Sequence, residues 1–191
     1  MSTIGRQSDE LVDEFVAYLN RVGFQPKSPD QVPEQLRTSG TQYGWFCWQI
    51  QRAPSNPWVT EVVQRLPHAL PRAFQSLIER YRYCNFEIGP LMLFANTGQD
   101  VYYEFSTKVF ADKHLFPTLH KHGYLQIGNP YEGNYDPVCF DTNRRNRDDD
   151  PIVQLDHEEI LMHTRIRVVQ EIAPSFLAFV QRAIIDKIGV R

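Results

Sequence analysis

The stretch that decides the fold runs from Gly123 to Glu158 and reads GYLQIGNPYEGNYDPVCFDTNRRNRDDDPIVQLDHE; we call it the central stretch. It contains three short apolar runs, at residues 124–127, 138–140 and 152–155, each with β-branched or aromatic residues and each bounded by Gly, Asn, Asp or Pro. Runs of this length and composition favour strands over helices. Because the intervening segments are rich in turn residues and too short for a helical crossover, we expect three consecutive antiparallel strands.

Helical and extended patterns follow one another along the rest of the chain. Apolar residues at three- and four-residue spacing, with a capping residue, proline or glycine near the ends, predict helices. The order of elements predicts a single α+β domain with a central, mostly antiparallel sheet flanked by helices. The expected helices lie at residues 8–22, 57–66, 71–81, 112–122 and 174–188. Outside the central stretch, strands are expected at residues 43–50 and, as one strand or two, at residues 86–94. Residues 25–42 are expected to form a loop, and residues 160–169 fit either a strand or a helix.

Composition limits the class of protein. With 191 residues, 42% of them hydrophobic, the chain can bury a core without disulfides or metals. The formal net charge of −3 lacks the basic excess of a nucleic-acid-binding protein, so we expect no nucleic-acid partner. Cys47, Cys84 and Cys139 form no CxxC pair, and no apolar run has the length of a membrane span or the features of a signal sequence. We therefore expect a cytoplasmic protein with reduced thiols and no membrane contact.

A cluster of histidines raises the question of a metal site. His114, His120 and His122 are close in sequence, but His120 and His122 would lie on different faces of a helix, and no HExxH motif or cysteine pair completes a ligand set. The acidic run at residues 148–150 lacks the alternating ligands and central glycine of an EF-hand. We therefore expect neither a metal nor another cofactor.

Cys139 is the candidate nucleophile of the central stretch. With His157 as a base and Asp141 or Asp156 to orient that base, it would make a small thiol-dependent hydrolase, and a metal-assisted hydrolase at the same strands is the related possibility. The other interpretation is that Cys139, in the middle of an expected strand, is a small buried residue. We favour the buried residue and assign no catalytic residue, and we keep the hydrolase as the alternative function.

The most aromatic segment, residues 43–50, allows two interpretations. Its rings can fill the core between the N-terminal helices and the sheet, which we favour because aromatic side chains dominate cores. They can instead form a platform on which a ligand stacks. A small-ligand sensor of that kind would require Trp45 and Trp48 to line a cavity.

Charge is distributed unevenly and suggests where a partner binds. Residues 124–159 hold nine acids and three bases, whereas the rest of the chain is mildly basic. An acidic face accelerates association with a basic partner, and exposed tyrosines supply rigid contact area. The residues of this hypothetical partner-binding surface are Asn129, Tyr131, Asn134, Tyr135, Asp136, Asp148, Asp149 and Asp150.

The motifs of the central stretch and its flanks resemble the SUKH superfamily, which includes the fungal cell-wall-synthesis regulators of SMI/KNR type and many bacterial immunity proteins. The resemblance covers residues 66–184, and the order and spacing of the motifs match as well as the residue types. It is carried by a Pro-led helix at 71–81, the turn Ile127-Gly128, a strand ending in Asp141, a strand followed by Asp156-His157-Glu158, and a C-terminal helix opening on Ala173-Pro174-Ser175-Phe176.

The resemblance implies a SUKH-like α+β core at residues 57–191, with residues 1–56 forming an N-terminal helix and aromatic extension packed on it. It also implies a protein that binds another protein rather than an enzyme. In bacterial members the partner is often a toxin domain, frequently a nuclease, that is neutralised by its immunity protein; a regulatory interaction is the other role in the family. Residues 96–122 and the sequence Asn134-Tyr135-Asp136, in place of a Gly-Asp turn, depart from the family pattern.

Overall fold

Helices and strands follow one another along the part of the chain that this computed structural model describes, which is residues 3–53, 57–66, 68–99, 101, 104–131, 134–146 and 148–190. The α-helices are α1 (Thr3–Val22), α2 (Pro57–Arg65), α3 (Arg72–Arg80), α4 (Phe105–Ala111), α5 (Leu115–Lys121), α6 (His157–His163) and α7 (Phe176–Ile185). The strands are β1 (Arg37–Gln42), β2 (Trp45–Trp48), β3 (Gln51–Arg52), β4 (Tyr81–Arg82), β5 (Phe86–Ile88), β6 (Leu91–Leu93), β7 (Tyr124–Pro130), β8 (Val138–Asp141), β9 (Ile152–Leu155) and β10 (Val168–Ala173).

The largest sheet has six strands in the order β10-β9-β8-β7-β6-β5, and every neighbouring pair is antiparallel. Its centre is the meander expected from the sequence, because Leu125 of β7 pairs with Phe140 of β8, which pairs with Ile152 of β9. The predicted fold class, a single α+β domain with a mostly antiparallel sheet flanked by helices, is therefore confirmed. The suggested division after residue 56 adjoins residues 54–56, which lie outside the described part, and it stays a prediction.

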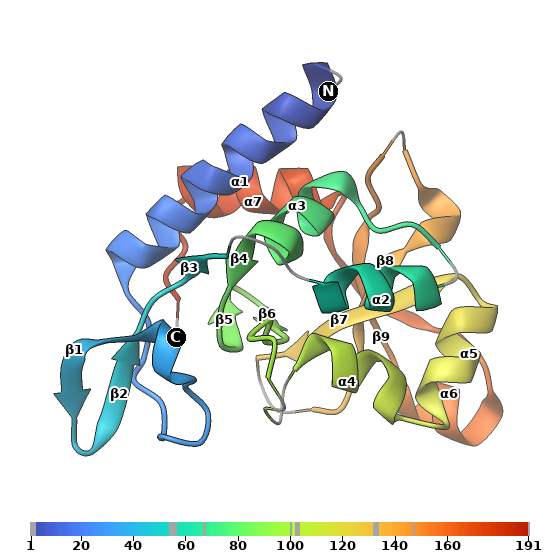
Figure 1. The fold of residues 1–191 in the computed structure, drawn as a ribbon. Coiled ribbons are helices and arrows are strands. Elements are labelled where there is room, and N and C mark those ends of the chain that lie inside the picture. The colour runs from blue at the N-terminus through green and yellow to red at the C-terminus, as the bar shows by residue number, and fades with distance from the viewer. Residues whose placement is uncertain are drawn as a thin grey trace.

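Both faces of the meander are buried, which explains why β8 and β9 are mostly apolar rather than alternating; Asp141 and Gln154 are their buried polar residues. On one face Phe140 packs edge-to-face against Phe74 of α3 and Phe176 of α7, with ring centroids 5.1 and 5.9 Å apart. On the other face Cys139 and Val153 lie in a second apolar cluster with residues of α5 and α6. Figure 1 shows α1, α3 and α7 gathered on one side of the molecule and α4, α5 and α6 on another.

The N-terminal part departs from the sequence expectation in two places. α1 begins at Thr3 instead of Ser8, so Ser8 is a buried residue within the helix and not its cap. Residues 25–42, expected to be a loop, contain β1, which pairs with β2 in a hairpin apart from the main sheet. The sequence of β1 is polar and partly exposed, so it shows none of the apolar alternation by which strands are predicted.

Later in the chain the structure differs from the sequence expectation at residues 160–169, at the start of α5 and at α4. Residues 160–169 divide between the end of α6 and the start of β10, with Thr164 in a left-handed conformation (φ 51°) at the break. α5 begins at Leu115 and not at residue 112, because the Asp112 carboxylate accepts hydrogen bonds from the backbone N–H groups of His114 and Leu115, both at 2.8 Å. α4 was not expected, since its seven residues are too few to reveal a period.

The aromatic residues of the β1-β2 hairpin divide between core and surface. Trp48 is buried, stacks on Phe24 with ring centroids 4.1 Å apart, and donates its indole N–H to a backbone carbonyl. Trp45 and Tyr43 are exposed and line an open cavity of about 510 Å³. The core-filling interpretation therefore holds for Trp48, whereas Trp45 faces solvent.

β6 and β7 approach each other closely at Gly128. A Cβ atom there would lie 2.2 Å from the carbonyl oxygen of Met92 and 2.7 Å from a methyl group of Leu91. Because the nearer atom belongs to the backbone, no side-chain rotation relieves the clash. Gly128 is thus a packing requirement of the sheet. Ile127-Gly128, expected to be a turn, lies within β7, which continues to Pro130.

We expect Gly128→Ala to lower the free energy of unfolding by about 3 kcal/mol, because the two strands must separate to admit a methyl group. Urea denaturation followed by circular dichroism measures this. Gly189→Ala is the matched control, since a Cβ atom at Gly189 meets nothing within 4 Å. Equal stabilities of the two variants would contradict the close approach of β6 and β7.

Candidate functional site

The run Asp148-Asp149-Asp150 does not form an exposed acidic face. Asp148 is exposed, but Asp150 is fully buried, and its carboxylate accepts hydrogen bonds from Nε and Nη2 of Arg145 at 2.7 and 2.6 Å. The same guanidinium donates to the backbone carbonyl of Ala69. The two-fold hydrogen bond with Asp150 raises the pKa of Arg145, and it ties this loop to the segment that precedes α3.

Asp149 caps the N-terminus of α7. Its carboxylate accepts hydrogen bonds from the backbone N–H groups of Phe176 and Leu177, at 3.0 and 2.9 Å, while the Ser175 hydroxyl accepts that of Ala178. Such oxygens satisfy the free amides of a helix N-terminus. Asp149 and Asp150 therefore hold the fold, which corrects the expectation that the whole acidic run is available to a partner.

The other predicted residues lie together at the end of β7 and in the loop after it. Tyr135 is 80% exposed and Tyr131 is 40% exposed. Asn129 and Tyr135 line a cavity of about 520 Å³ whose wall also includes His157. Tyr131 and Asn134 line a second cavity, of about 320 Å³. We call Asn129, Tyr131, Asn134 and Tyr135 the rim.

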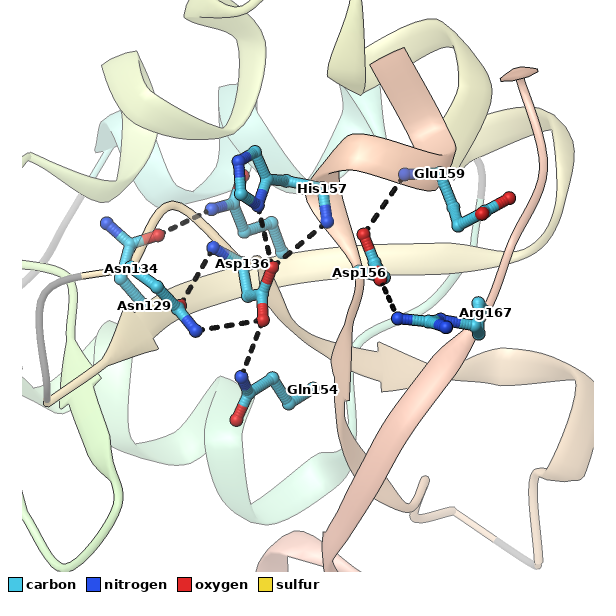
Figure 2. A network of polar contacts seen from close by, with 9 residues as sticks. Asn129, Asn134, Asp136, Gln154, Asp156, His157, Glu159 and Arg167 are labelled. Atoms are coloured by element: carbon cyan, nitrogen blue, oxygen red, sulfur yellow. Dashed lines mark hydrogen bonds and ion pairs between the residues drawn. The ribbon is translucent and has the colours of Figure 1, made fainter. Parts of the chain in front are cut away.

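Asp136, the last residue of the predicted surface, is buried behind the rim and surrounded by donors (Figure 2). Its Oδ1 accepts the backbone N–H of His157 at 3.0 Å and lies 2.7 Å from Nδ1 of the same residue. Its Oδ2 accepts the side-chain amides of Gln154 and Asn134, at 2.8 and 3.0 Å. The carboxylate thus joins the rim to β9 and to the start of α6.

The hydrogen bonds keep Asp136 ionised and determine which ring nitrogen of His157 donates to it. Burial alone would raise the pKa of Asp136, but the hydrogen bonds from His157 and Gln154 outweigh it, so the pKa is lowered and the group is ionised at neutral pH. An ionised carboxylate only accepts, so Nδ1 of His157 carries the proton that it donates. In the neutral ring Nε2 is then the acceptor, and an imidazole oriented in this way can bind a donor group beside the cavity.

Sequence reasoning placed Asp136 on the surface and did not pair it with His157. The contact between Asp136 and His157 follows from the register of β8 and β9, in which Val138 is opposite Gln154. Continuing the antiparallel register by two residues brings Asp136 beside Asp156 and its neighbour His157. The sequence predicts that these strands are paired but not their register, so the contact could not be derived from it.

One group of described residues has the composition of a metal site. Ligand atoms of Asp136, Asp156 and His157 lie within 4.8 Å of one another. The Asp156 carboxylate, however, accepts the backbone N–H of Glu159 at 3.0 Å, which caps α6, and it pairs with Arg167 (Figure 2). Since a metal would have to displace these partners and those of Asp136, the group fits a helix start better than a metal centre.

The three histidines considered from the sequence lie around α5. His114 precedes the helix and His122 follows it, while the ring of His120 stacks on Phe116 with centroids 5.6 Å apart. The expectation that they bind no metal stays a prediction.

Cys139 and its proposed partners are not brought together. The thiol is fully buried in the second apolar cluster, and burial, followed by the charge of Asp141, raises its pKa well above the ordinary value. His157 bonds Asp136, and the Asp141 carboxylate accepts Nε–H of Arg144 at 2.7 Å. A catalytic thiol requires access and a lowered pKa, so the interpretation of Cys139 as a buried strand residue is confirmed.

No protein-family model matches this chain, and no curated protein matches it at a significant level. The SUKH resemblance therefore rests on the order and spacing of the motifs between residues 66 and 184. No helix in the described part of the chain combines the length and the apolar character needed to cross a membrane.

We expect Asp136→Asn to lower the free energy of unfolding at neutral pH by about 2 kcal/mol. The amide keeps one acceptor oxygen, but its NH2 group cannot accept, so either His157 or the pair Gln154 and Asn134 loses its acceptor. The pKa of Asp136 is lower in the folded state. Its carboxylate therefore stabilises the fold above the unfolded pKa of about 3.9, and this contribution is lost as the pH falls through the folded value.

The wild type should accordingly lose more stability than Asp136→Asn when the pH is lowered from about 5 to about 2. Urea denaturation at several pH values measures the difference. Asp148→Asn, which changes an exposed carboxylate, is the control. If Asp136→Asn and Asp148→Asn show the same pH dependence, the Asp136 network does not stabilise the fold in this way.

Proposed function

We propose that this protein is a protein-binding module and that the rim is its binding surface. The observation that carries the proposal is the exposure of Tyr131 and Tyr135 beside a loop end that buried Asp136 holds in place. Tyrosine offers a large amphipathic contact surface with few rotatable bonds, so it loses little entropy on binding. Tyrosines next to a pre-organised segment are therefore suited to recognising another protein.

The two cavities beside the rim provide places where a partner can insert side chains. The larger has apolar walls, including Phe94 and Leu161, together with polar groups. The smaller is lined by the amides of Gln154 and Gln170. Binding energy in protein interfaces concentrates where an anchor side chain fills such a pocket and is shielded from water.

The partner's charge and class complete the proposal. Glu158, next to His157 in the wall of the larger cavity, is exposed, and its charge favours a basic group on the partner. Asp148 lies at the other end of β9 from the rim. The family resemblance supplies the class: a toxin domain, such as a nuclease, that this protein neutralises in the cytoplasm as an immunity protein. A regulatory interaction protein is the other form of the same proposal.

We expect the immobilised protein to retain a stoichiometric partner from a lysate of its native host, identified by mass spectrometry. Tyr135→Ala should reduce the retained amount about tenfold or more, because a truncated anchor in an interface costs several kcal/mol. Tyr43→Ala is the matched control, since it removes another highly exposed tyrosine, from the β1-β2 hairpin. Its retention should equal that of the wild type.

With the partner in hand, Glu158→Lys should slow association and reduce its dependence on ionic strength, whereas Tyr135→Ala should mainly accelerate dissociation. Asp149 and Asp150 are left unchanged because Asp149 caps α7 and buried Asp150 pairs with Arg145, so replacing either would destabilise the fold. Surface plasmon resonance at low and high salt measures both rates. Unaltered kinetics in two folded variants would move the interface away from the rim, and the hairpin with Tyr43 and Trp45 would be the next surface to test.

A further inference from the structure

One edge of the six-stranded sheet is open. β10 pairs with β9 on its inner side, and no strand in the described part of the chain pairs with its outer side. Residues 168–171 are all exposed. Gln170 and Glu171 keep one register against β9, so they point to opposite faces, and since both are exposed neither face is covered there. The outward N–H and C=O groups of this segment are therefore accessible to another strand.

The opposite edge is better protected. β5 has three residues, and its last residue, Ile88, forms a bridge with Val190. β10 has six residues, contains no lysine or proline, and exposes Val168 and Val169 by 44% and 49%, although its register with β9 shifts twice. Natural sheets shield their edges with short strands, prolines, charges or β-bulges. β10 has one charge, Glu171, and two register shifts against β9, but it is twice as long as β5 and has no lysine or proline.

The charges along this edge are self-complementary. Arg165 and Arg167 precede the two valines, and Glu171 follows them. When two copies of such a strand run antiparallel, the basic end of each lies against the acidic end of the other. A parallel arrangement would instead bring like charges together, so the pattern favours a two-fold symmetric pair.

We propose that β10 of one copy pairs antiparallel with β10 of a second copy, with the two-fold axis at Val169. Arg167 of each copy then lies opposite Glu171 of the other, and Val169 lies opposite itself. Within the chain Arg167 already pairs with Asp156, and Glu171 with Arg144. The side chains of Arg167 and Glu171 are 65% and 43% exposed, and a guanidinium with five donors or a carboxylate with several lone pairs can serve two partners.

Sedimentation velocity over the micromolar range tests the dimer. We expect the wild type to shift from one chain to two as its concentration rises, because a strand edge is a small interface and binds weakly. Val169→Arg would place two guanidinium groups opposite each other at the axis and should weaken the dimer about tenfold or more. Ile185→Arg, at a 75% exposed residue of α7, is the matched control and should dimerise like the wild type.

A wild type that remains a single chain up to about 1 mM overturns the proposal, since even small specific interfaces associate below that concentration. A dimer that Val169→Arg leaves intact also overturns it. Gln170 of β10 also lines the smaller cavity beside the rim, so partner binding is measured on Tyr135→Ala, which leaves β10 unchanged, and dimerisation on Val169→Arg. The two proposals can then fail separately.

A disulfide trap tests the register. It uses a Cys47→Ser background, because the other two cysteines are buried. Val169→Cys places two thiols across the axis, where antiparallel Cα–Cα distances of about 4.5 to 5.5 Å suit a disulfide. Mild oxidation should convert this variant into a covalent dimer several-fold faster than Ile185→Cys. Equal rates contradict the register, and the experiment also covers the case in which Val169→Arg does not fold.

Discussion

A carboxylate that is taken out of water must be given hydrogen-bond donors, and the ends of the central strands are built around this requirement. Asp136 lies before β8, Asp141 ends it, and Asp150 lies before β9; all three are buried. Removing a donor would leave a buried charge uncompensated, so each loop must follow the path that brings its donor to the carboxylate. The respective donors are His157, Arg144 and Arg145.

The same requirement changes how the acidity of the central stretch should be understood. Of its acids, Asp136, Asp141 and Asp150 are buried, and Asp149 and Asp156 cap helices. Asp141, Asp150 and Asp156 are each paired with an arginine, which largely cancels their contribution to the long-range field, and salt screens the exposed charges beyond about 10 Å. Counting acids along the sequence therefore overestimates electrostatic steering, and recognition at the rim has to depend more on contact area and shape than on charge.

How far the sequence predicts the structure depends on what each element buries. β8 and β9 could be predicted because burial on both faces makes most of their residues apolar, and β1 could not, because it is polar and partly exposed. α6 buries only Ile160, so it has no apolar stripe that would distinguish it from a strand. The contact between Asp136 and His157 depends on the register of two strands, which hydrophobic pattern alone leaves undetermined.

A single chain of hydrogen bonds connects the open edge of the sheet to the rim. The amide of Gln170 in β10 donates to Gln154 at 2.8 Å, and Gln154 donates to Asp136 at 2.8 Å. Asp136 in turn accepts hydrogen bonds from His157 and from Asn134, and Asn134 belongs to the rim. Gln170 is next to the residue at the proposed two-fold axis, so a second strand there would restrict the first link of this chain.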